Sequence, residues 1–200
     1  MPDRTQEQEW IGLAVLGDDD AFARLVEAYQ SPVYNLCYRM LGDGAEAEDA
    51  AQESFLKAYQ GLGSYDLNRS FTTWLLSIAS HHCIDRLRKK RILALSLEDL
   101  LPSQEKPDDK PGPEAMVARS ETEESVRNVL HQLAEKDRAA IVLRYWYEMS
   151  YEEISQTLSL TVSAVKSRLH RARREVAQQW MEQETSLLTT RGRHDEASAL

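Results

Sequence analysis

Basic side chains mark one face of residues 162–176. Apolar residues recur there at helical spacing, at Val162, Val165, Leu169, Ala172 and Val176. The opposite face carries Lys166, Ser167, His170, Arg171, Arg173 and Arg174. Arg and Lys donate hydrogen bonds to phosphates and to guanine edges, and Ser and His can reach several bases. An ordinary solvated helix usually mixes charges, whereas no acidic residue occurs between Glu153 and Glu175. This segment therefore predicts a helix that binds nucleic acid.

The residues just before this segment predict its partner helix. Residues 150–153 read Ser-Tyr-Glu-Glu, a capping box that opens a short helix over 150–158. A short capped helix, a tight turn and a basic amphipathic helix make a helix-turn-helix, whose second helix enters a major groove. We expect base contacts from Lys166, Ser167, His170 and Arg171, and phosphate contacts from Arg168, Arg173 and Arg174.

A second basic segment closes a long helix predicted over 70–91. Phe71 and Trp74 fall on its apolar stripe and are expected in the core. Five of the six residues 86–91 are basic, more than a helix C-terminus needs, so they predict phosphate binding. His81, His82 and Cys83 are adjacent and not at chelating spacing, so neither a metal nor a cofactor is predicted.

The charge distribution supports two separate phosphate contacts. The chain of 200 residues carries a net charge of −9, but residues 67–94 and 154–174 each carry +5. The remaining segments are acidic, which weakens non-specific binding to DNA. This pattern suits a protein that needs a partner to hold it on DNA.

Hydrophobic periodicity predicts an all-α fold of two small domains. The first covers 1–93, with separate helices before and after Ser31-Pro32 and another over about 45–62. A flexible, acidic, Pro-rich linker over 94–113 contains Pro102, Pro107, Pro111 and Pro113. The second domain, 114–180, is expected to be a four-helix, winged-helix-like domain, and 181–200 a loose tail. No apolar run approaches the roughly 18 residues of a membrane span, and the N-terminus lacks a signal-peptide core, so we expect a cytoplasmic, non-inserted protein. The sequence contains no nucleophile motif and no Gly-rich phosphate loop, so it does not point to an enzyme.

In this order, several motifs resemble the sigma-70 family of bacterial transcription initiation factors, in its extracytoplasmic-function (ECF) branch. The first domain carries them at residues 20–29, 48–59, 71–79 and 84–88. The second carries them at 143–145, 149–154 and 165–173. Each motif alone is weak, but together, across the linker, they cover most of the chain and are highly specific.

The resemblance implies roles that the residues alone do not assign. It implies a contact with the clamp of core RNA polymerase at Asp49, Gln52, Glu53 and Phe55. It implies a site that reads and opens the minus-ten promoter element, with one base flipped into a pocket. Its residues are Tyr65, Arg69, Phe71, Trp74, His81, Arg86, Arg88 and Lys89. The basic helix 162–176 then reads the minus-thirty-five element. The family often has Asn at the position of His81, so base preference there is expected to be unusual. Control by an anti-sigma protein is also implied.

Two other functions fit part of the sequence. A helix-turn-helix regulator could bind an operator without acting as a sigma subunit, and polymerase binding through Asp49 and Glu53 would separate the two. A metal- or redox-responsive sensor could use His81, His82 and Cys83, and the metal content of the purified protein would test it.

Overall fold

Every element of the computed structural model is helical within the described residues, which are 3–67, 69–98 and 119–197. The all-α prediction is confirmed. Four helices lie in the described part of the chain after residue 118, and no β-wing occurs among the described residues of that half. None of the described helices is both long and apolar enough to cross a membrane.

The N-terminal half is built from α1 (Arg4–Val15), α2 (Asp19–Leu41), α3 (Gly44–Gly61), the short 3₁₀ helix η1 (Leu62–Ser64) and α4 (Phe71–Glu98). Asp3, Asp18 and Asp43 accept backbone hydrogen bonds at the starts of α1, α2 and α3. These caps satisfy amides that the first turn of a helix leaves free. The apolar faces of α2, α3 and α4 meet in a core whose fully buried side chains include Leu25, Val33, Leu36, Met40, Leu75 and Leu76.

α2 corrects one expectation, because Pro32 lies inside a single helix and does not start a new one. Proline removes one backbone donor and usually bends or ends a helix. Here the buried stripe runs through the proline without a break, since Leu25, Tyr29, Val33 and Leu36 stay on one face. Packing of that stripe therefore outweighs the lost hydrogen bond.

The C-terminal half consists of α5 (Arg119–Gln132), α6 (Glu135–Trp146), α7 (Tyr151–Leu158) and α8 (Val162–Ala197). The predicted capping box at Ser150 and Glu153 is present, with both of its hydrogen bonds. Ser159 adopts a left-handed conformation (φ 52°) at the end of α7 and makes the tight turn into α8. Ile154, Val165 and Leu169 are fully buried between α6, α7 and α8.

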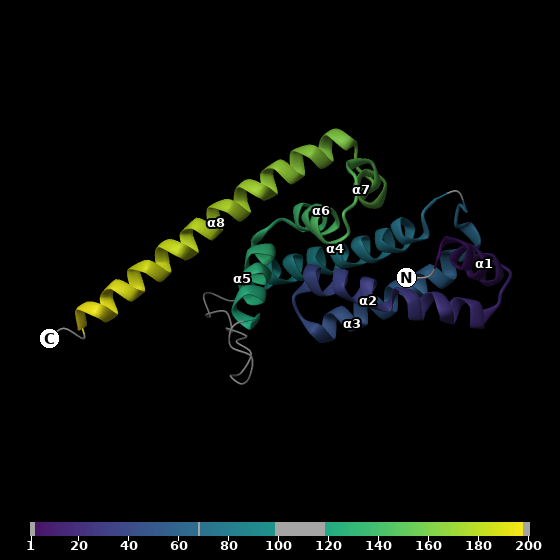
Figure 1. Cartoon of the computed structure of the whole chain (residues 1–200), viewed down its shortest axis with the longest axis horizontal. Coiled ribbons are helices and arrows are strands. Elements are labelled where there is room, and N and C mark those ends of the chain that lie inside the picture. The colour runs from purple at the N-terminus through teal and green to yellow at the C-terminus, as the bar shows by residue number, and fades with distance from the viewer. Residues whose placement is uncertain (1–2, 68, 99–118, 198–200) are drawn as a thin grey trace.

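Two boundaries differ from those expected. α4 continues to Glu98, so residues 94–98 of the expected linker are helical, while 99–113 lie outside the described residues. The prediction of a loose tail was also wrong for residues 181–197, because α8 continues to Ala197. This part of α8 projects beyond the rest of the molecule (Figure 1). The stretch contains no proline and many good helix formers, so a helix can continue there without an apolar period.

The two halves pack directly on each other. α6 contacts α2 and α4, α7 packs on α4, and α5 contacts α2 (Figure 1). Tyr147 donates a hydrogen bond to the carbonyl of Pro32 at 2.5 Å, and Arg91 Nη1 lies 3.1 Å from Glu135 Oε1. The helix-turn-helix is thus held over the long helix α4, which carries the other basic segment.

Candidate nucleic-acid and protein interfaces

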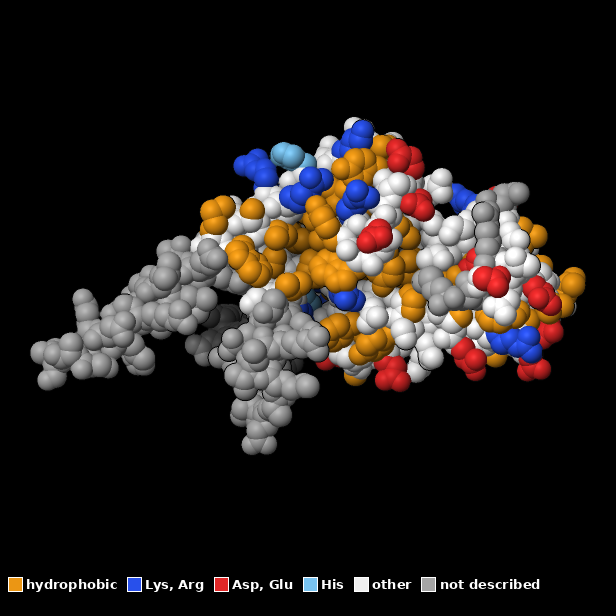
Figure 2. All heavy atoms as spheres, viewed as in Figure 1, with side chains coloured by type: hydrophobic (Ala, Val, Ile, Leu, Met, Phe, Trp, Pro, Cys, Tyr) orange, Lys and Arg blue, Asp and Glu red, His pale blue; other side chains and the backbone are white. Residues whose placement is uncertain are grey.

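The outer face of α8 presents the basic side chains that the sequence assigned to it. Lys166, Ser167, His170, Arg171, Arg173 and Arg174 are all exposed, whereas Val165, Leu169 and Ala172 are buried. In Figure 2, Lys, Arg and His side chains gather along the upper edge of the molecule, where α7 and the first turns of α8 lie. The side-chain chemistry and exposure suit a surface that binds the phosphates and base edges of DNA.

Two arginines of this helix also bind a buried acid. Arg168 donates to Asp137 at 2.6 Å, and Arg171 donates to both of its oxygens at 2.6 and 3.1 Å. Burial on its own opposes ionisation of Asp137, but the hydrogen bonds from Arg171 and Arg168 outweigh it and lower the carboxyl pKa. The sequence analysis missed Asp137, because nothing in its local pattern separates it from an ordinary first-turn acid.

The residues before and at the start of α4 form an aromatic cluster. The ring centroids of Tyr65 and Trp74 lie 4.9 Å apart, and Phe71 lies 5.6 Å from each. Tyr65 and Phe71 are buried and Trp74 is half-buried, while Arg69 is exposed beside them. The Tyr65 hydroxyl donates to the carbonyl of Arg69 and thereby fixes the loop. Burial, with nearby Glu7 and Asp66, raises the pKa of Tyr65 to about 12. The cluster is therefore mainly structural.

His81 and His82 have different surroundings on α4. Both are half-buried; His81 Nδ1 lies 2.8 Å from the Ser77 carbonyl, and His82 Nδ1 lies 2.7 Å from Lys57 Nζ. Burial and the neighbouring cations lower the pKa of His82. No group of three potential metal ligands occurs in the part of the chain that the structure describes. Cys83 is fully buried, and its hydrogen bond with Cys37 raises its thiol pKa, which disfavours the reactive thiolate.

The basic end of α4 is not a free cluster. Arg86 lies 4.0 Å from Asp49, and Arg88 lies 4.0 Å from Asp85. Lys90 pairs with Glu46, and Arg91 with Glu135. Each pair has at least one exposed partner, and ion pairs open to solvent contribute little to stability, so phosphates can compete for these cations.

The acidic face of α3 adjoins this basic end. Asp49, Gln52 and Glu53 are exposed and Phe55 is half-buried, with exposed Leu56 next to them. The face thus combines exposed acidic side chains with one exposed apolar side chain. The Asp49–Arg86 pair places the edge of this surface against the predicted minus-ten residues.

α7 covers part of the surface predicted to read the minus-ten element. A small cavity of about 30 Å³ is lined by Arg69, Ser70, Thr73, Trp74 and Ser77 from one half and by Gln156 from the other. A flipped base needs more room than this cavity provides. In this arrangement α7 therefore leaves too little room for a flipped base beside Trp74.

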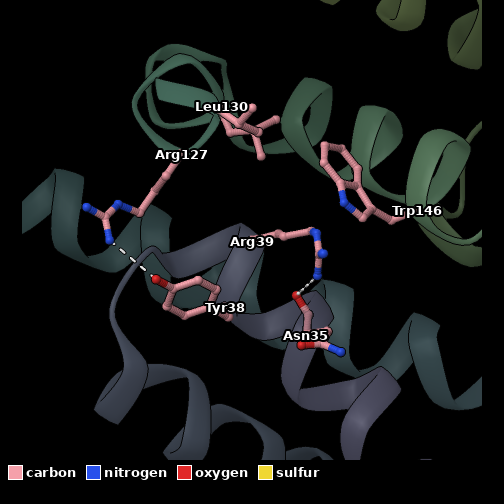
Figure 3. A pocket seen from close by; sticks show the side chains of 7 residues that line it. Asn35, Tyr38, Arg39, Arg127, Leu130 and Trp146 are labelled. Atoms are coloured by element: carbon pink, nitrogen blue, oxygen red, sulfur yellow. Dashed lines mark hydrogen bonds between the residues drawn. The ribbon is translucent and has the colours of Figure 1, made fainter. Parts of the chain in front are cut away.

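Two larger hollows are lined by residues of the C-terminal helices. One of about 440 Å³ lies between the halves, where Arg39 sits 5.0 Å over the Trp146 ring and Arg127 donates to the Tyr38 hydroxyl at 3.3 Å (Figure 3). The other, of about 660 Å³, is an apolar groove of α5, α6 and α8. Its lining includes Val126, Val129, Leu130, Ile141, Tyr145, Trp146, Val176, Trp180 and Met181. Leu130 and Trp146 line both hollows, so the two adjoin.

Comparison with known proteins assigns both halves to one family. Residues 25–92 match the profile of Sigma-70 region 2, and residues 123–176 match that of Sigma-70 region 4. The ECF RNA polymerase sigma factor SigW of Bacillus subtilis strain 168 is 41% identical over 82% of this chain and 90% of its own. The RNA polymerase sigma-H factor of Pseudomonas aeruginosa is 34% identical over 88% of this chain and 94% of its own.

Solved structures share the fold. CnrH in complex with the cytosolic domain of CnrY aligns with a TM-score of 0.64 and 24% identity over 86% of this chain and 95% of that one. The sigma factor RpoE of Bartonella quintana, bound to the anti-sigma factor NepR, aligns with a TM-score of 0.61 and 19% identity over 80% and 96%. A regulator with only a helix-turn-helix would have no need of region 2, so the operator-binding alternative loses its support. The chain belongs to the ECF sigma factors of the sigma-70 family, the non-catalytic polymerase subunits that direct transcription initiation.

Proposed function

We propose that this sigma factor binds core RNA polymerase and two promoter elements through three separate surfaces. The exposed face of α3, at Asp49, Gln52, Glu53 and Phe55, binds the clamp of core RNA polymerase. The loop 65–69 and α4 read the minus-ten element and help to open it, through Tyr65, Arg69, Phe71, Trp74, His81, Arg86, Arg88 and Lys89. The outer face of α8 reads the minus-thirty-five element.

One observation carries this proposal. The exposed basic side chains of α8 have no acid among them, whereas the exposed acids of α3 lie in the other half of the molecule. Opposite charges on separate helices suit different partners, because DNA repels the acidic face and attracts the basic one. Within the N-terminal half, Tyr65 and Phe71 support the Trp74 ring, and Arg69 and Lys89 stay exposed for phosphates.

In vitro run-off transcription on genomic DNA tests the whole proposal. Purified protein is mixed with core polymerase from its own host, and the RNA 5′ ends are sequenced. We expect discrete new starts that share two upstream elements. If no new starts appear and the protein forms no stable complex with that polymerase, the proposal is contradicted. The alternative of an operator-binding regulator would then be favoured again.

Charge variants test the division between surfaces. Glu53→Lys should weaken polymerase binding at least several-fold, while Glu27→Lys, an exposed acid on α2, makes the same charge change elsewhere. Arg174→Ala should leave polymerase binding intact and reduce initiation at promoters that depend on the minus-thirty-five element, because each such contact contributes up to roughly 1–3 kcal/mol. Loss of polymerase binding in Arg174→Ala would contradict separate surfaces.

The same proposal includes an anti-sigma protein as the controlling partner. Two solved structures of similar fold are described as complexes with CnrY and with the anti-sigma factor NepR. The apolar groove of α5, α6 and α8 offers a surface of the right chemistry for an amphipathic helix. Trp180→Ala is expected to weaken that partner's binding, measured on a complex purified from the native host. Glu152→Ala, an exposed change on α7, serves as the control.

A further inference from the structure

Asp137 is a carboxylate that the fold buries. It lies in the first turn of α6, and its side chain is 1% exposed. Burying an ionised carboxylate is costly, and the attraction of its partners offsets the cost only when the geometry is good. Its partners are the two arginines on the flank of α8, so the position of this acid concerns the helix proposed to read DNA.

The hydrogen bonds to Arg171 use one defined edge of its guanidinium. Nε donates to Oδ2 at 2.6 Å, and Nη2 donates to Oδ1 at 3.1 Å. A guanidinium has five N–H donors in a planar fork, so three remain, one on Nη2 and two on Nη1. Two of these form the end-on edge, which matches guanine O6 and N7 or two phosphate oxygens. The Arg171 side chain is 54% exposed, so this edge remains open to a ligand.

Arg168 has a different place in the same cluster. Its Nη1 donates to Oδ1 of Asp137 at 2.6 Å, its side chain is only 26% exposed, and its Nε is buried without a hydrogen-bond partner. A half-enclosed guanidinium of this kind is poorly placed for a bidentate contact with DNA. Arg168 supplies instead a second positive charge that keeps the carboxylate ionised and fixed. This revises the phosphate contact predicted for it.

We propose that Asp137 is a positioning residue for promoter recognition, which holds Arg171 so that its end-on edge points at a guanine of the minus-thirty-five element. The proposal rests on the proposed role of α8. A free arginine must give up rotational freedom to make a bidentate contact, whereas one held on its other edge has already lost it. The same negative charge weakens the attraction of the cluster for phosphates at random sequences. Asp137 therefore increases specificity more than affinity.

The effects on specificity and on affinity distinguish a positioning residue from one that only forms a structural ion pair. Asp137→Asn keeps the shape and removes the charge. In holoenzyme, we expect it to reduce discrimination between guanine and the other bases at one position of the minus-thirty-five element by about 5- to 100-fold. Non-specific DNA binding should stay equal or become tighter, with a steeper salt dependence. A structural role alone would lower initiation at all promoters together or change nothing, and either result would overturn the proposal.

Matched variants make the outcome unambiguous. Arg171→Ala should lose discrimination at the same base pair, and Asp137→Asn should add nothing in that background. Arg171→Lys keeps the charge without the planar fork and should also lose discrimination, which tests the idea even if Asp137→Asn fails to fold. Glu152→Gln removes an exposed acid of α7 and should leave base preference unchanged. If Arg171→Ala changes base preference at no position of the minus-thirty-five element, the role proposed for α8 is wrong. If Arg171→Ala changes it and Asp137→Asn does not, only the positioning role of Asp137 is wrong.

Discussion

Arg138 is a cation that the fold encloses almost completely, at 4% exposure. Its guanidinium donates to the carbonyl of Met40 at the end of α2, and to those of His131 at 2.7 Å and Leu133 at 3.4 Å. Carbonyls at a helix C-terminus carry partial negative charge and suit a cation. Burial lowers the pKa of Arg138 to about 10, which leaves it protonated at neutral pH. One side chain thus ties the second half of the chain to the end of α2.

Arg138→Ala should lower the free energy of unfolding by roughly 2–4 kcal/mol, because it leaves buried carbonyls without donors. Urea unfolding followed by circular dichroism measures the change. Lys136→Ala, an exposed neighbour on the same helix, should change stability by less than about 0.5 kcal/mol. Equal effects of the two variants would contradict the role of Arg138.

His131 makes the same junction sensitive to pH. Burial, and then the charges of Arg138, Arg127 and Lys90, lower its pKa to about 4 against the opposing effect of Glu46. The unfolded chain therefore binds a proton between pH 6.5 and about 4 that the folded chain does not. Stability from this group is full above pH 6.5 and is lost as the pH falls towards 4.

His131→Asn should remove that part of the pH dependence. The expected contribution is on the order of 1 kcal/mol, because the imidazole is partly open to solvent, which screens the charges. Urea midpoints of both proteins between about pH 4 and pH 7 measure it. Parallel curves for the two proteins would show that His131 titrates normally.

At the scale of elements, the end of α2 needs a glycine for two reasons. Gly42 has φ +78°, a conformation that L side chains rarely adopt, and a Cβ there would lie 1.9 Å from His131 Nε2. Gly17 shares only the first feature, since its φ is +94° and a Cβ added there would meet nothing within 4 Å. Comparing substitutions at the two glycines therefore distinguishes the cost of backbone strain from the cost of the clash between the halves.

Gly17→Ala should cost about 1–2 kcal/mol from the left-handed conformation alone. Gly42→Ala should cost about 1 kcal/mol more, because the His131 imidazole must swing away from its place. In a His131→Ala background that extra cost should vanish. Thermal unfolding of these variants gives the comparison, and an equal cost for both glycines in the native background would contradict the clash.

The sequence predicted the elements whose signals are local. The capping box at Ser150, the helical stripe of α8 and the exposed acids of α3 depend on spacing that can be counted. The course of α2 through Pro32 could not be predicted, because its buried stripe outweighs a proline only when α3 and α4 pack against it. Asp137 and Gln156 could not be predicted either, since each matters through a residue far away in the chain: Arg171 and Trp74.

At the scale of the whole molecule, the two halves are packed so that α7 covers part of the surface proposed to read the minus-ten element. The basic face of α8 is open, whereas α7 packs on α4 and Gln156 closes the cavity beside Trp74 and Arg69. Tyr147 with Pro32 and Arg91 with Glu135 are polar contacts between the halves, beside the buried apolar packing that both halves share. A larger partner that competes for the same surfaces can still separate them. We therefore expect α7 to leave α4 before the minus-ten element is read.

A reversible cross-link between α4 and α7 tests that expectation. Ser77→Cys with Gln156→Cys places two thiols around the same small cavity, and a short reagent with a reducible centre can join them. Cys37 and Cys83 are buried and should not react. The joined protein should lose initiation at promoters that require the minus-ten site by about ten-fold or more, and recover it when the link is reduced. Each single-cysteine variant, treated in the same way, controls for the reagent. Full activity of the joined protein would show that α7 can stay on α4 while DNA is read, and that the cavity by Trp74 is not where the flipped base enters.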